Sequence, residues 1–401
     1  MVRELFIFLY LCWFKVHFLF FRLFPLREKV TFVVSFGDNS RYVYEALKRK
    51  KPDMPVVFLR KSTCPYTFAD TSAKVYEFES VRLWHMWCSI YHLATSKYII
   101  IDNYYGFLAA APFRPEVECI QLWHAAGAFK TFGLRDASVA RRSPRARKRF
   151  LQVYSQFHKV VVGSEAMAHL FMQAFQLSEK AILRTGVPRT DFFYDDQKQQ
   201  SIKDELYRKN PWLKDKKIIL YAPTYRDNEL ETFHLHLDLE RMYEELAPLD
   251  YVLLLKLHPA VKRCLDYDQQ RYADFLFDYS DYQDVNELLL VTDWLITDYS
   301  SIPFEFCLLN KPVIFYMYDI ESYRRERGLW DGWDKKLPGP VLFATEQIID
   351  YIRQGNIDFD AIRSFAEEWN CYSKGRSSEN LVDYLLAESQ TAREVAVTRG
   401  Y

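Results

Sequence analysis

The stretch Leu289–Tyr316, LLVTDWLITDYSSIPFEFCLLNKPVIFY, indicates how the chain folds. An apolar run ends at the turn Asp298–Ser301, a helix-like segment follows at Ile302–Leu309, and a second apolar run occupies Pro312–Tyr316. This order of strand, turn, helix and strand is typical of an open parallel sheet. Ligands of such sheets bind beyond the carboxyl ends of the strands, where the N–H groups of a helix N-terminus point at them. The turn therefore predicts a site for an anion such as a phosphate, unless its side chains only cap the helix.

Similar apolar runs recur along the chain and predict an α/β protein with two parallel sheets. The runs of the first series are Val30–Phe36, Val56–Leu59, Tyr98–Asp102, Glu118–Trp123 and Lys159–Gly163. Those of the second series are Ile218–Ala222, Tyr251–Leu257, Phe275–Phe277, Trp294–Thr297 and Val313–Tyr316. We expect two Rossmann-like domains that face each other across a central cleft. The predicted boundaries are residues 1–28 for a membrane-associating helix, 29–196 for the first domain and 197–401 for the second, which closes with helices over Arg363–Glu388.

Composition excludes several classes of protein. The 401 residues include 53 basic and 53 acidic side chains, so the net charge points to no particular partner. Seven cysteines are scattered without a C-x-x-C pair, as expected of reduced thiols in a cytosolic domain. The glycines form neither the dinucleotide-binding fingerprint nor a P-loop, and no H-E-x-x-H or metal-spaced Cys/His cluster is present. We therefore predict no metal and no cofactor.

The segment Leu5–Phe24 is long and apolar enough to cross a membrane, but Lys15 and Arg22 interrupt it. On a helical wheel these two charges share a narrow stripe with Glu4, which is typical of a helix that lies in the membrane interface. The alternatives are a single membrane span and a helix packed against the protein or a partner. No small-residue cleavage site follows, so a removable signal peptide is not expected.

A second segment, Lys130–Arg149, carries eight basic residues and one acidic residue. Such a run is commonly a solvated face, and nucleic acid is one possible target. Beside an apolar N-terminal helix it suits an anionic membrane surface better, or the pyrophosphate of a lipid carrier. We therefore predict a membrane partner and no nucleic acid. The basic residues assigned to the acceptor or membrane are Lys130, Arg141, Arg142 and Arg145.

One loop of the first domain carries a candidate general base. His124 directly follows a predicted strand and is followed by Ala125-Ala126-Gly127, whose small side chains let a ligand approach the backbone. Imidazole is the side chain best matched to general-base chemistry near neutral pH. A histidine that only makes structural contacts at the domain surface is the alternative.

Three loops of the second domain carry candidate phosphate ligands at the ends of predicted strands. Hydroxyl, ammonium, guanidinium and imidazole groups there can donate to phosphate oxygens or neutralise a pyrophosphate. One helical turn further on, Glu305 can accept hydrogen bonds from ribose hydroxyls or cap backbone N–H groups. The candidates in these loops are Thr224, Arg226, Lys256, His258, Ser300 and Ser301.

Taken in order, four segments resemble the CDP-glycerol glycerophosphotransferase family of wall teichoic acid synthesis. They are WHAAGAFKTFG, APTYR, LKLHP, and TDYSSIPFEF followed by NKPVIFY, over roughly residues 118–340. Members of this family resemble GT-B glycosyltransferases in fold and associate with the cytoplasmic side of the membrane. They transfer glycerol phosphate from CDP-glycerol to a lipid-linked acceptor and release CMP. The resemblance therefore implies a phosphotransferase with a GT-B-like fold.

The resemblance also implies roles for individual residues. His124 falls on the base that deprotonates the acceptor hydroxyl, and His258 falls on a contact to the donor pyrophosphate. The chain differs from the commonest first motif, H-G-T-P, in the three residues after His124. The other implied contacts are Ser300 and Ser301 at the pyrophosphate, Glu305 near the cytidine ribose or glycerol, and Arg327 at a phosphate.

The implied acceptor is an undecaprenyl-pyrophosphate-linked disaccharide, extended at the cytoplasmic face of the cell membrane by a peripheral protein. The compact chain resembles the primases, which add the first unit. The alternatives are transfer of another polyol phosphate or a sugar phosphate, polymerisation, and a membrane-docked scaffold without catalysis. The presence of both His124 and His258 argues against the scaffold.

Overall fold

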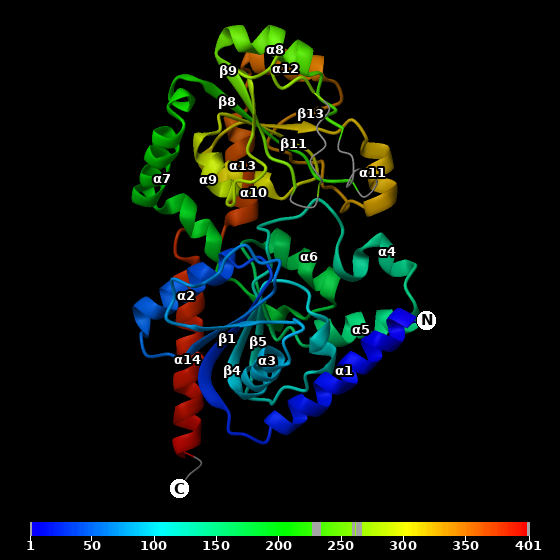
Figure 1. Ribbon diagram of the computed structural model, residues 1–401, viewed down its shortest axis with the longest axis vertical. Coiled ribbons are helices and arrows are strands. Elements are labelled where there is room, and N and C mark those ends of the chain that lie inside the picture. The colour runs from blue at the N-terminus through cyan, green and yellow to red at the C-terminus, as the bar shows by residue number, and fades with distance from the viewer. Residues whose placement is uncertain (1, 227–233, 259–260, 262–266, 399–401) are drawn as a thin grey trace. The chain divides into compact units, whose positions relative to one another are not determined.

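The computed structural model describes residues 2–226, 234–258, 261 and 267–398, without the side chains of residues 2 and 388–398 (Figure 1). The described chain is α/β and contains two parallel sheets, as the sequence predicts. Contacts divide it into two compact units. Unit 1 comprises Met1–Ala126, Phe132–Asp191 and Asn370–Tyr401, and unit 2 comprises Gly127–Thr131 and Phe192–Trp369.

Unit 1 is built on a seven-stranded parallel sheet in the order β3-β2-β1-β4-β5-β6-β7. Its strands are β1 (Arg27–Val34), β2 (Val56–Arg60), β3 (Lys74–Glu77), β4 (Ser96–Ile101), β5 (Glu118–Gln121), β6 (Lys159–Val161) and β7 (Ile182–Leu183). Its α-helices are α1 (Val2–Phe21), α2 (Asp38–Lys50), α3 (Leu83–Thr95), α4 (Ala137–Ala140), α5 (Pro144–Tyr154), α6 (Glu165–Phe175) and α14 (Ser377–Thr398). Short 3-10 helices are η1 (Gly106–Ala110), η2 (Gly133–Arg135), η3 (Glu179–Ala181) and η4 (Pro188–Tyr194), the last of which leads into unit 2. The central strands β1, β2, β4 and β5 are mostly buried, which explains the continuous apolar runs of the sequence.

The C-terminal helix α14 belongs to unit 1, and this corrects the predicted second domain of residues 197–401. It runs beside α2 in Figure 1 and buries Leu381, Val382 and Leu385 in the core of unit 1. The hydroxyl of Tyr98 on β4 also donates to the carbonyl of Leu385 at 2.8 Å. Because these apolar residues share one face of the helix, their burial accounts for its place in unit 1.

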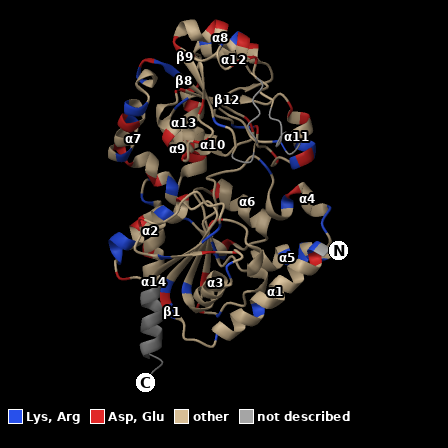
Figure 2. Ribbon diagram, viewed as in Figure 1, with Lys and Arg blue, Asp and Glu red and all other residues tan. Residues whose placement is uncertain are grey.

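Helix α1 packs one face against unit 1 and exposes the other. Phe14 and Phe18 are buried, with their rings 5.2 Å from Phe107 and 5.6 Å from Phe113. The helix is long and apolar enough to cross a membrane by length and composition, and Figure 2 shows it mostly uncharged. The exposed apolar residues of the helix are Leu5, Phe6, Phe8, Leu9, Val16, Leu19 and Phe20.

Unit 2 contains a six-stranded parallel sheet in the order β10-β9-β8-β11-β12-β13. Its strands are β8 (Lys217–Ala222), β9 (Tyr251–Leu255), β10 (Leu276–Asp278), β11 (Trp294–Thr297), β12 (Val313–Tyr316) and β13 (Val341–Leu342). Its α-helices are α7 (Asp196–Lys209), α8 (Leu239–Leu246), α9 (Val285–Val291), α10 (Ile302–Phe306), α11 (Ile320–Arg327), α12 (Thr345–Gln354) and α13 (Phe359–Asn370), which ends at the unit boundary. Short 3-10 helices are η5 (Pro211–Asp215), η7 (Ala247–Leu249) and η8 (Cys307–Leu309). The helix-like segment predicted at Ile302–Leu309 thus consists of α10 followed by η8.

Each sheet has a point at which the strand order reverses, between β1 and β4 in unit 1 and between β8 and β11 in unit 2. An aspartate follows the second strand of each pair, Asp102 after β4 and Asp298 after β11. Its carboxylate accepts hydrogen bonds from the turn after the neighbouring strand, which includes Ser35 in unit 1 and Thr224 in unit 2. Open α/β sheets bind their ligands at such reversals. Both units therefore have a buried aspartate that binds the neighbouring turn at the position where ligands are expected.

Candidate active site

In unit 2, Asp298 joins the loop after β8 to the turn after β11. Its Oδ1 accepts hydrogen bonds from the backbone N–H of Thr224 at 2.8 Å and from the hydroxyl of Thr224 at 2.6 Å. The same oxygen accepts the N–H of Tyr299 at 2.6 Å. Because Asp298 is buried, these bonds hold the two segments together without competition from water. The structure thus brings two of the predicted loops together at the strand-order reversal.

The two serines of the turn differ in their local roles. Ser300 accepts a hydrogen bond from the N–H of Ile302 at 3.3 Å, so its hydroxyl caps the start of α10. Ser301 is the N-cap residue of α10, but its side chain makes no capping bond. Glu305 is buried within α10. The hydroxyl of Ser300 therefore caps the helix, which was the alternative to anion binding at this turn. The hydroxyl of Ser301 does not cap it.

Arg226 is buried and paired with carboxylates. It donates to both oxygens of Asp319, at 2.7 and 2.9 Å, and lies 3.0 Å from Asp298 Oδ2. Its guanidinium also lies over the rings of Tyr299 and Tyr323, at 5.3 and 4.7 Å. Burial alone would lower the pKa of Arg226, but the bonds to Asp319 and the charge of Asp298 hold it above the ordinary value. The guanidinium of Arg226 is thus engaged by two carboxylates of unit 2, and its predicted contact with donor phosphate stays a prediction.

Lys256 and His258 follow β9 beside Tyr225. The ammonium of Lys256 donates to the carbonyl of Ser280 at 2.8 Å, and the ring of His258 lies 4.6 Å from that of Tyr225. Partial burial of the imidazole, together with the ammonium groups of Lys130 and Lys256, lowers the pKa of His258. A neutral imidazole among cations gains a proton more readily when an anion binds beside it.

The segment Gly127–Thr131 continues the loop of His124 but belongs to unit 2. There Lys130 forms an antiparallel β-bridge with Leu329. Gly127 packs so closely that an added Cβ would lie 2.3 Å from the ring of Phe304. The glycine of the sequence motif is therefore required by packing in unit 2.

This placement separates Lys130 from the exposed basic stretch with which the sequence grouped it. Burial lowers the pKa of Lys130, the carboxylate of Asp298 opposes this shift, and the guanidinium groups of Arg327 and Arg226 add to it. Arg327 ends α11, and its guanidinium lies over the ring of Tyr225 at 5.6 Å. Lys130 and Arg327 thus join Lys256 and His258 in a group of basic side chains in unit 2, which we call the basic cluster. The sequence identified three of its members as donor ligands but placed Lys130 elsewhere.

His124 lies beyond the end of β5 in unit 1. The predicted strand ends before Trp123, because Trp123 has φ +61° and its N–H donates to the side chain of Gln121 at 2.8 Å. The imidazole stacks on the rings of Phe36 and Trp123, with centroids 4.2 and 4.5 Å away. Its Nδ1 lies 3.3 Å from the backbone oxygen of Asp102. A proton on Nδ1 makes this hydrogen bond and leaves Nε2 as the basic nitrogen.

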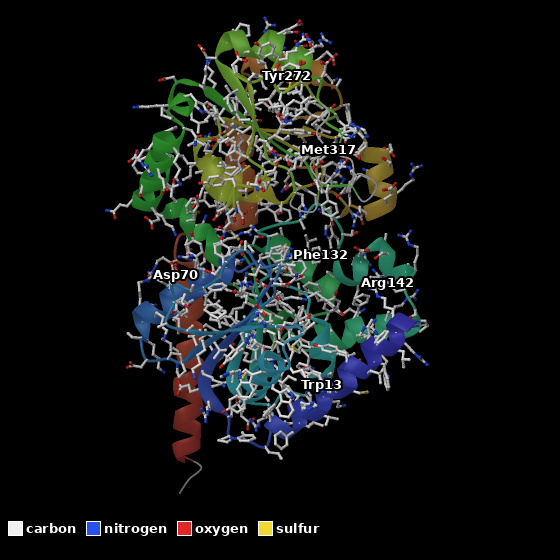
Figure 3. The ribbon with its side chains drawn as sticks, viewed as in Figure 1. Trp13, Asp70, Phe132, Arg142, Tyr272 and Met317 are labelled. Atoms are coloured by element: carbon white, nitrogen blue, oxygen red, sulfur yellow. The ribbon has the colours of Figure 1, made fainter. Side chains whose placement is uncertain are left out.

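Three of the predicted acceptor or membrane residues remain together on unit 1. Arg141, Arg142 and Arg145 are exposed on and after the loop that joins α4 to α5, and Figure 3 labels Arg142. The same region contacts the start of α1, because Arg149 on α5 lies 3.2 Å from Glu4. The exposed arginines and the exposed apolar face of α1 therefore belong to neighbouring elements of one unit.

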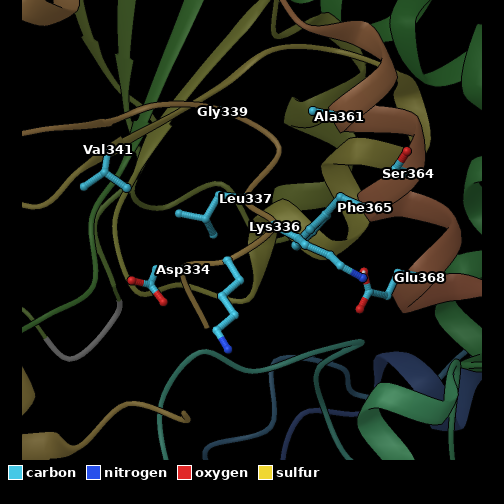
Figure 4. Close-up of a pocket in the computed structure, with 10 residues that line it drawn as sticks. Asp334, Lys336, Leu337, Gly339, Val341, Ala361, Ser364, Phe365 and Glu368 are labelled. Carbon is cyan, nitrogen blue, oxygen red and sulfur yellow. The ribbon is translucent and has the colours of Figure 1, made fainter. Parts of the chain in front are cut away.

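A cavity of about 460 Å³ in unit 2 involves other residues (Figure 4). It is lined by the segment around Leu337 and by residues of α13 such as Phe365, and Lys336 pairs with Glu368 there at 3.2 Å. None of the site residues predicted from the sequence lines this cavity. Across the described residues, no group of three or more His, Cys, Asp or Glu side chains is arranged to hold a metal ion.

Solved structures share this arrangement of two parallel α/β sheets. The wall teichoic acid polymerase TagF matches with a TM-score of 0.77 at 23% identity, over 98% of this chain and 99% of that chain. A UDP-GlcNAc 2-epimerase from Neisseria meningitidis matches with a TM-score of 0.56 at 14% identity, over 90% of this chain and 99% of that chain. At these identities the likeness concerns the fold, which is GT-B-like, as predicted.

Sequence comparison identifies the family. The family model for CDP-Glycerol:Poly(glycerophosphate) glycerophosphotransferase matches residues 16–387, and the chain belongs to this family of transferases. A teichoic acid glycerol-phosphate primase of Bacillus spizizenii is 36% identical over 91% of this chain and 94% of its own length. A teichoic acid poly(ribitol-phosphate) polymerase of the same organism is also 36% identical over 91% of this chain, but the chain spans only 57% of that relative's length.

Proposed function

We propose that this chain transfers glycerol phosphate from CDP-glycerol to a lipid-linked disaccharide, releases CMP, and acts as a primase in wall teichoic acid synthesis. The observation that carries the proposal is the strand-order reversal of unit 2, where Asp298 unites the Thr224 loop with the Ser300–Ser301 turn. The basic cluster supplies positive charge in the same unit. A pyrophosphate is the ligand that this combination of hydroxyls and cations suits.

The basic cluster is the proposed binding site for the donor pyrophosphate. Lys130, Lys256, His258 and Arg327 neutralise its charge, and the hydroxyl of Ser301 donates to one of its oxygens. Glu305, one turn into α10, serves the ribose or glycerol hydroxyls. The lowered pKa values of Lys130 and His258 support this assignment, because mutual repulsion among the cations is relieved when an anion binds.

The proposed reaction is a displacement at the β-phosphorus of CDP-glycerol. The acceptor hydroxyl oxygen forms a bond to this phosphorus, and the bond from phosphorus to the oxygen shared with the α-phosphate breaks. The acceptor proton moves to Nε2 of His124, and the electron pair leaves with CMP. The basic cluster stabilises the negative charge that develops on the leaving group. His124 raises the nucleophilicity of the acceptor.

The primase role is supported by the identity to the glycerol-phosphate primase of Bacillus spizizenii, 36%, against 31% to the poly(glycerol phosphate) polymerase of the same organism. Ribitol phosphate transfer is the second candidate, because the identity to the poly(ribitol-phosphate) polymerase is the same 36%. The alternative of a scaffold without catalysis has no such support, because His124, His258 and Ser301 are all present.

Membrane association is proposed to occur through α1 and the exposed arginines. Because Phe14 and Phe18 are buried against unit 1, a span across the bilayer would strip the helix from its core contacts. An interfacial helix keeps these contacts and buries the opposite apolar face in lipid. Arg141, Arg142 and Arg145 then meet anionic headgroups of the cytoplasmic leaflet. This surface would bring the enzyme to an undecaprenyl-pyrophosphate-linked disaccharide.

The test is a transfer reaction with the purified chain, a lipid-linked disaccharide and either radiolabelled CDP-glycerol or CDP-ribitol. We expect CMP release and a lipid extended by one unit with CDP-glycerol alone. Transfer only from CDP-ribitol would show that the donor is CDP-ribitol. Long products would show that the chain is a polymerase. No transfer from either donor, under conditions in which a primase of the family is active, would contradict the proposal.

A further inference from the structure

The strand-order reversal of unit 1 is filled by the protein's own carboxylate. The side chain of Asp102 accepts three successive backbone N–H groups, from Ser35 at 3.0 Å, Phe36 at 2.9 Å and Gly37 at 2.8 Å. The hydroxyl of Tyr105 donates to the same carboxylate at 2.7 Å. Successive N–H groups of this kind form a concave nest that binds anions. A ligand phosphate therefore has no access to this turn while Asp102 occupies it.

The nest lies next to the proposed base. Phe36, whose N–H is one of the three donors, stacks on the imidazole of His124 with an interplanar angle of 18°. The backbone oxygen of Asp102 is the partner of His124 Nδ1 at 3.3 Å. Asp102 therefore influences His124 in two ways. Its backbone carbonyl accepts from the imidazole, and its carboxylate binds the N–H of Phe36, whose ring stacks on the imidazole.

The loop of His124 is also held by α2. Trp123 adopts φ +61°, a region that a bulky aromatic residue rarely occupies. The side chain of Asn39 on α2 donates to the Trp123 carbonyl at 3.1 Å. Such backbone strain persists where surrounding bonds enforce it, and it is concentrated at functional sites.

We infer that Asp102 is a positioning residue for His124: its carbonyl selects the imidazole tautomer, and its carboxylate fixes the turn that carries Phe36. The inference rests on the proposed role of His124 as the base. Burial raises the pKa of Asp102 to about 6, while the bonds from Tyr105 and the turn oppose this shift. These hydrogen bonds stabilise the buried carboxylate, because an ionised carboxylate has enough acceptor sites for all of them.

Three variants test the inference. Asp102→Asn keeps the size of the side chain but loses an acceptor, Asp102→Ala empties the nest, and Phe36→Leu removes the stacked ring while leaving the nest intact. The matched control is Asp70→Asn, an exposed aspartate of the same unit that pairs with Arg41 at 2.8 Å. The measurements are the single-turnover rate, the donor Kd, and the ¹⁵N spectrum of the imidazoles, in which His124→Gln assigns the His124 signals.

We expect the rate of both Asp102 variants and of Phe36→Leu to fall by about 10–100-fold, a part of the roughly 10²–10⁴-fold that a general base contributes, with the donor Kd unchanged. In the wild type the ¹⁵N spectrum should show a proton on Nδ1 of His124. The variants keep the Asp102 carbonyl but no longer hold the imidazole against it, so they should show a mixture of tautomers. Formate should restore the rate of Asp102→Ala by entering the nest, but not that of Asp102→Asn, whose amide fills it. An aspartate that only supported the fold would leave the His124 tautomer of the folded variants as in the wild type.

Wild-type rates and a wild-type tautomer in Asp102→Asn and Phe36→Leu would overturn the inference. If Asp102→Asn does not fold, Phe36→Leu and the formate rescue of Asp102→Ala decide in the same way. Failure of the proposed function has a different signature, because the wild type would then transfer from neither donor, and failure of the proposed role of His124 would show as normal turnover by His124→Ala. In that case the tautomer measurement still tests whether Asp102 positions the imidazole.

Discussion

His258 and Lys130 show how neighbouring charges tune single residues. Both lie among cations, and both have pKa values below their ordinary ranges, first because of burial and then because of nearby positive groups. A bound pyrophosphate reverses the second effect and favours the charged forms. Donor binding should therefore be coupled to proton uptake at these side chains.

This coupling predicts how donor affinity depends on pH. The pKa of His258 in the free protein lies below its ordinary 6.5, so the imidazole is mostly neutral at pH 7. As the pH falls from neutrality toward the lowered pKa of His258, protonation of its imidazole should strengthen the binding of the anionic donor. Calorimetric titration of CDP-glycerol checks this, with His258→Gln as the control. A wild-type Kd as flat with pH as that of His258→Gln would show that His258 does not face the donor.

A second prediction concerns Lys130. Lys130→Met should weaken donor binding about 10–100-fold, because a charge-assisted bond contributes roughly 1.5–3 kcal/mol. The matched control in unit 2 is Lys336→Met, which removes an ammonium that pairs with Glu368 at 3.2 Å. Equal donor affinities for the two variants would show that Lys130 does not bind the donor.

Sequence alone could identify most of the candidate residues but not their division of labour. Lys130 is followed in the chain by many basic residues, so the charge pattern of the sequence groups it with them. The fold instead places Gly127–Thr131 in unit 2. Arg226 has the residue type of a phosphate ligand, yet two carboxylates of unit 2 bind it. Asp102 gave no signal at all, because a single aspartate after a strand is common and its partners are backbone groups. These distinctions depend on tertiary contacts that no local motif encodes.

At the scale of elements, the turn after β11 depends on a buried acid. Asp298 binds the Thr224 loop, the Tyr299 backbone and the guanidinium of Arg226. Removal of one member of a buried ion pair leaves its partner uncompensated, which is more costly than replacing the whole pair. The Asp298 side chain is therefore required for the turn to form, whatever ligand binds there.

Asp298→Ala should accordingly lower the free energy of unfolding by about 3–5 kcal/mol. Urea denaturation followed by circular dichroism measures the change, with the exposed Asp331→Ala as the control. A cost below about 1 kcal/mol, the usual effect of a surface charge, would mean that these hydrogen bonds do not hold the turn.

The sequence predicts the buried central strands well and the edges poorly. β11 and β12 have the predicted bounds, because each is a short, fully buried apolar run between polar turns. β3, β7 and β13 have no predicted counterpart. β3 has no buried residue, and β7 and β13 are two residues long, so none presents an apolar run. The unit to which α14 belongs was also mispredicted, since amphipathicity shows that a helix packs but not against which core.

For the whole molecule, membrane binding should combine two separable contributions. Substitution of Phe6, Phe8 and Leu9 by serine removes exposed apolar area without touching the core, so binding to neutral vesicles should weaken. Substitution of Arg141, Arg142 and Arg145 by glutamine should weaken binding to anionic vesicles alone, by about 1 kcal/mol for each charge. Added salt should mimic the second effect, because these exposed charges are screened.

Co-sedimentation with vesicles of graded anionic content measures both contributions. If neither added salt nor the arginine substitutions weaken binding to anionic vesicles, the proposed electrostatic contribution is wrong. Extraction distinguishes an interfacial helix, which high pH or high salt should release at least in part, from a membrane span, which only detergent should release.

The central claim is that His124 acts on the acceptor while the basic cluster of unit 2 holds the donor. The most direct test compares the donor Kd and the single-turnover rate of His124→Ala and His258→Ala in the same preparation. The account predicts that His124→Ala binds CDP-glycerol as the wild type does but transfers about 10²–10⁴-fold more slowly, whereas His258→Ala binds the donor more weakly. Near-normal transfer by His124→Ala, or a loss of donor binding in His124→Ala with none in His258→Ala, would contradict it.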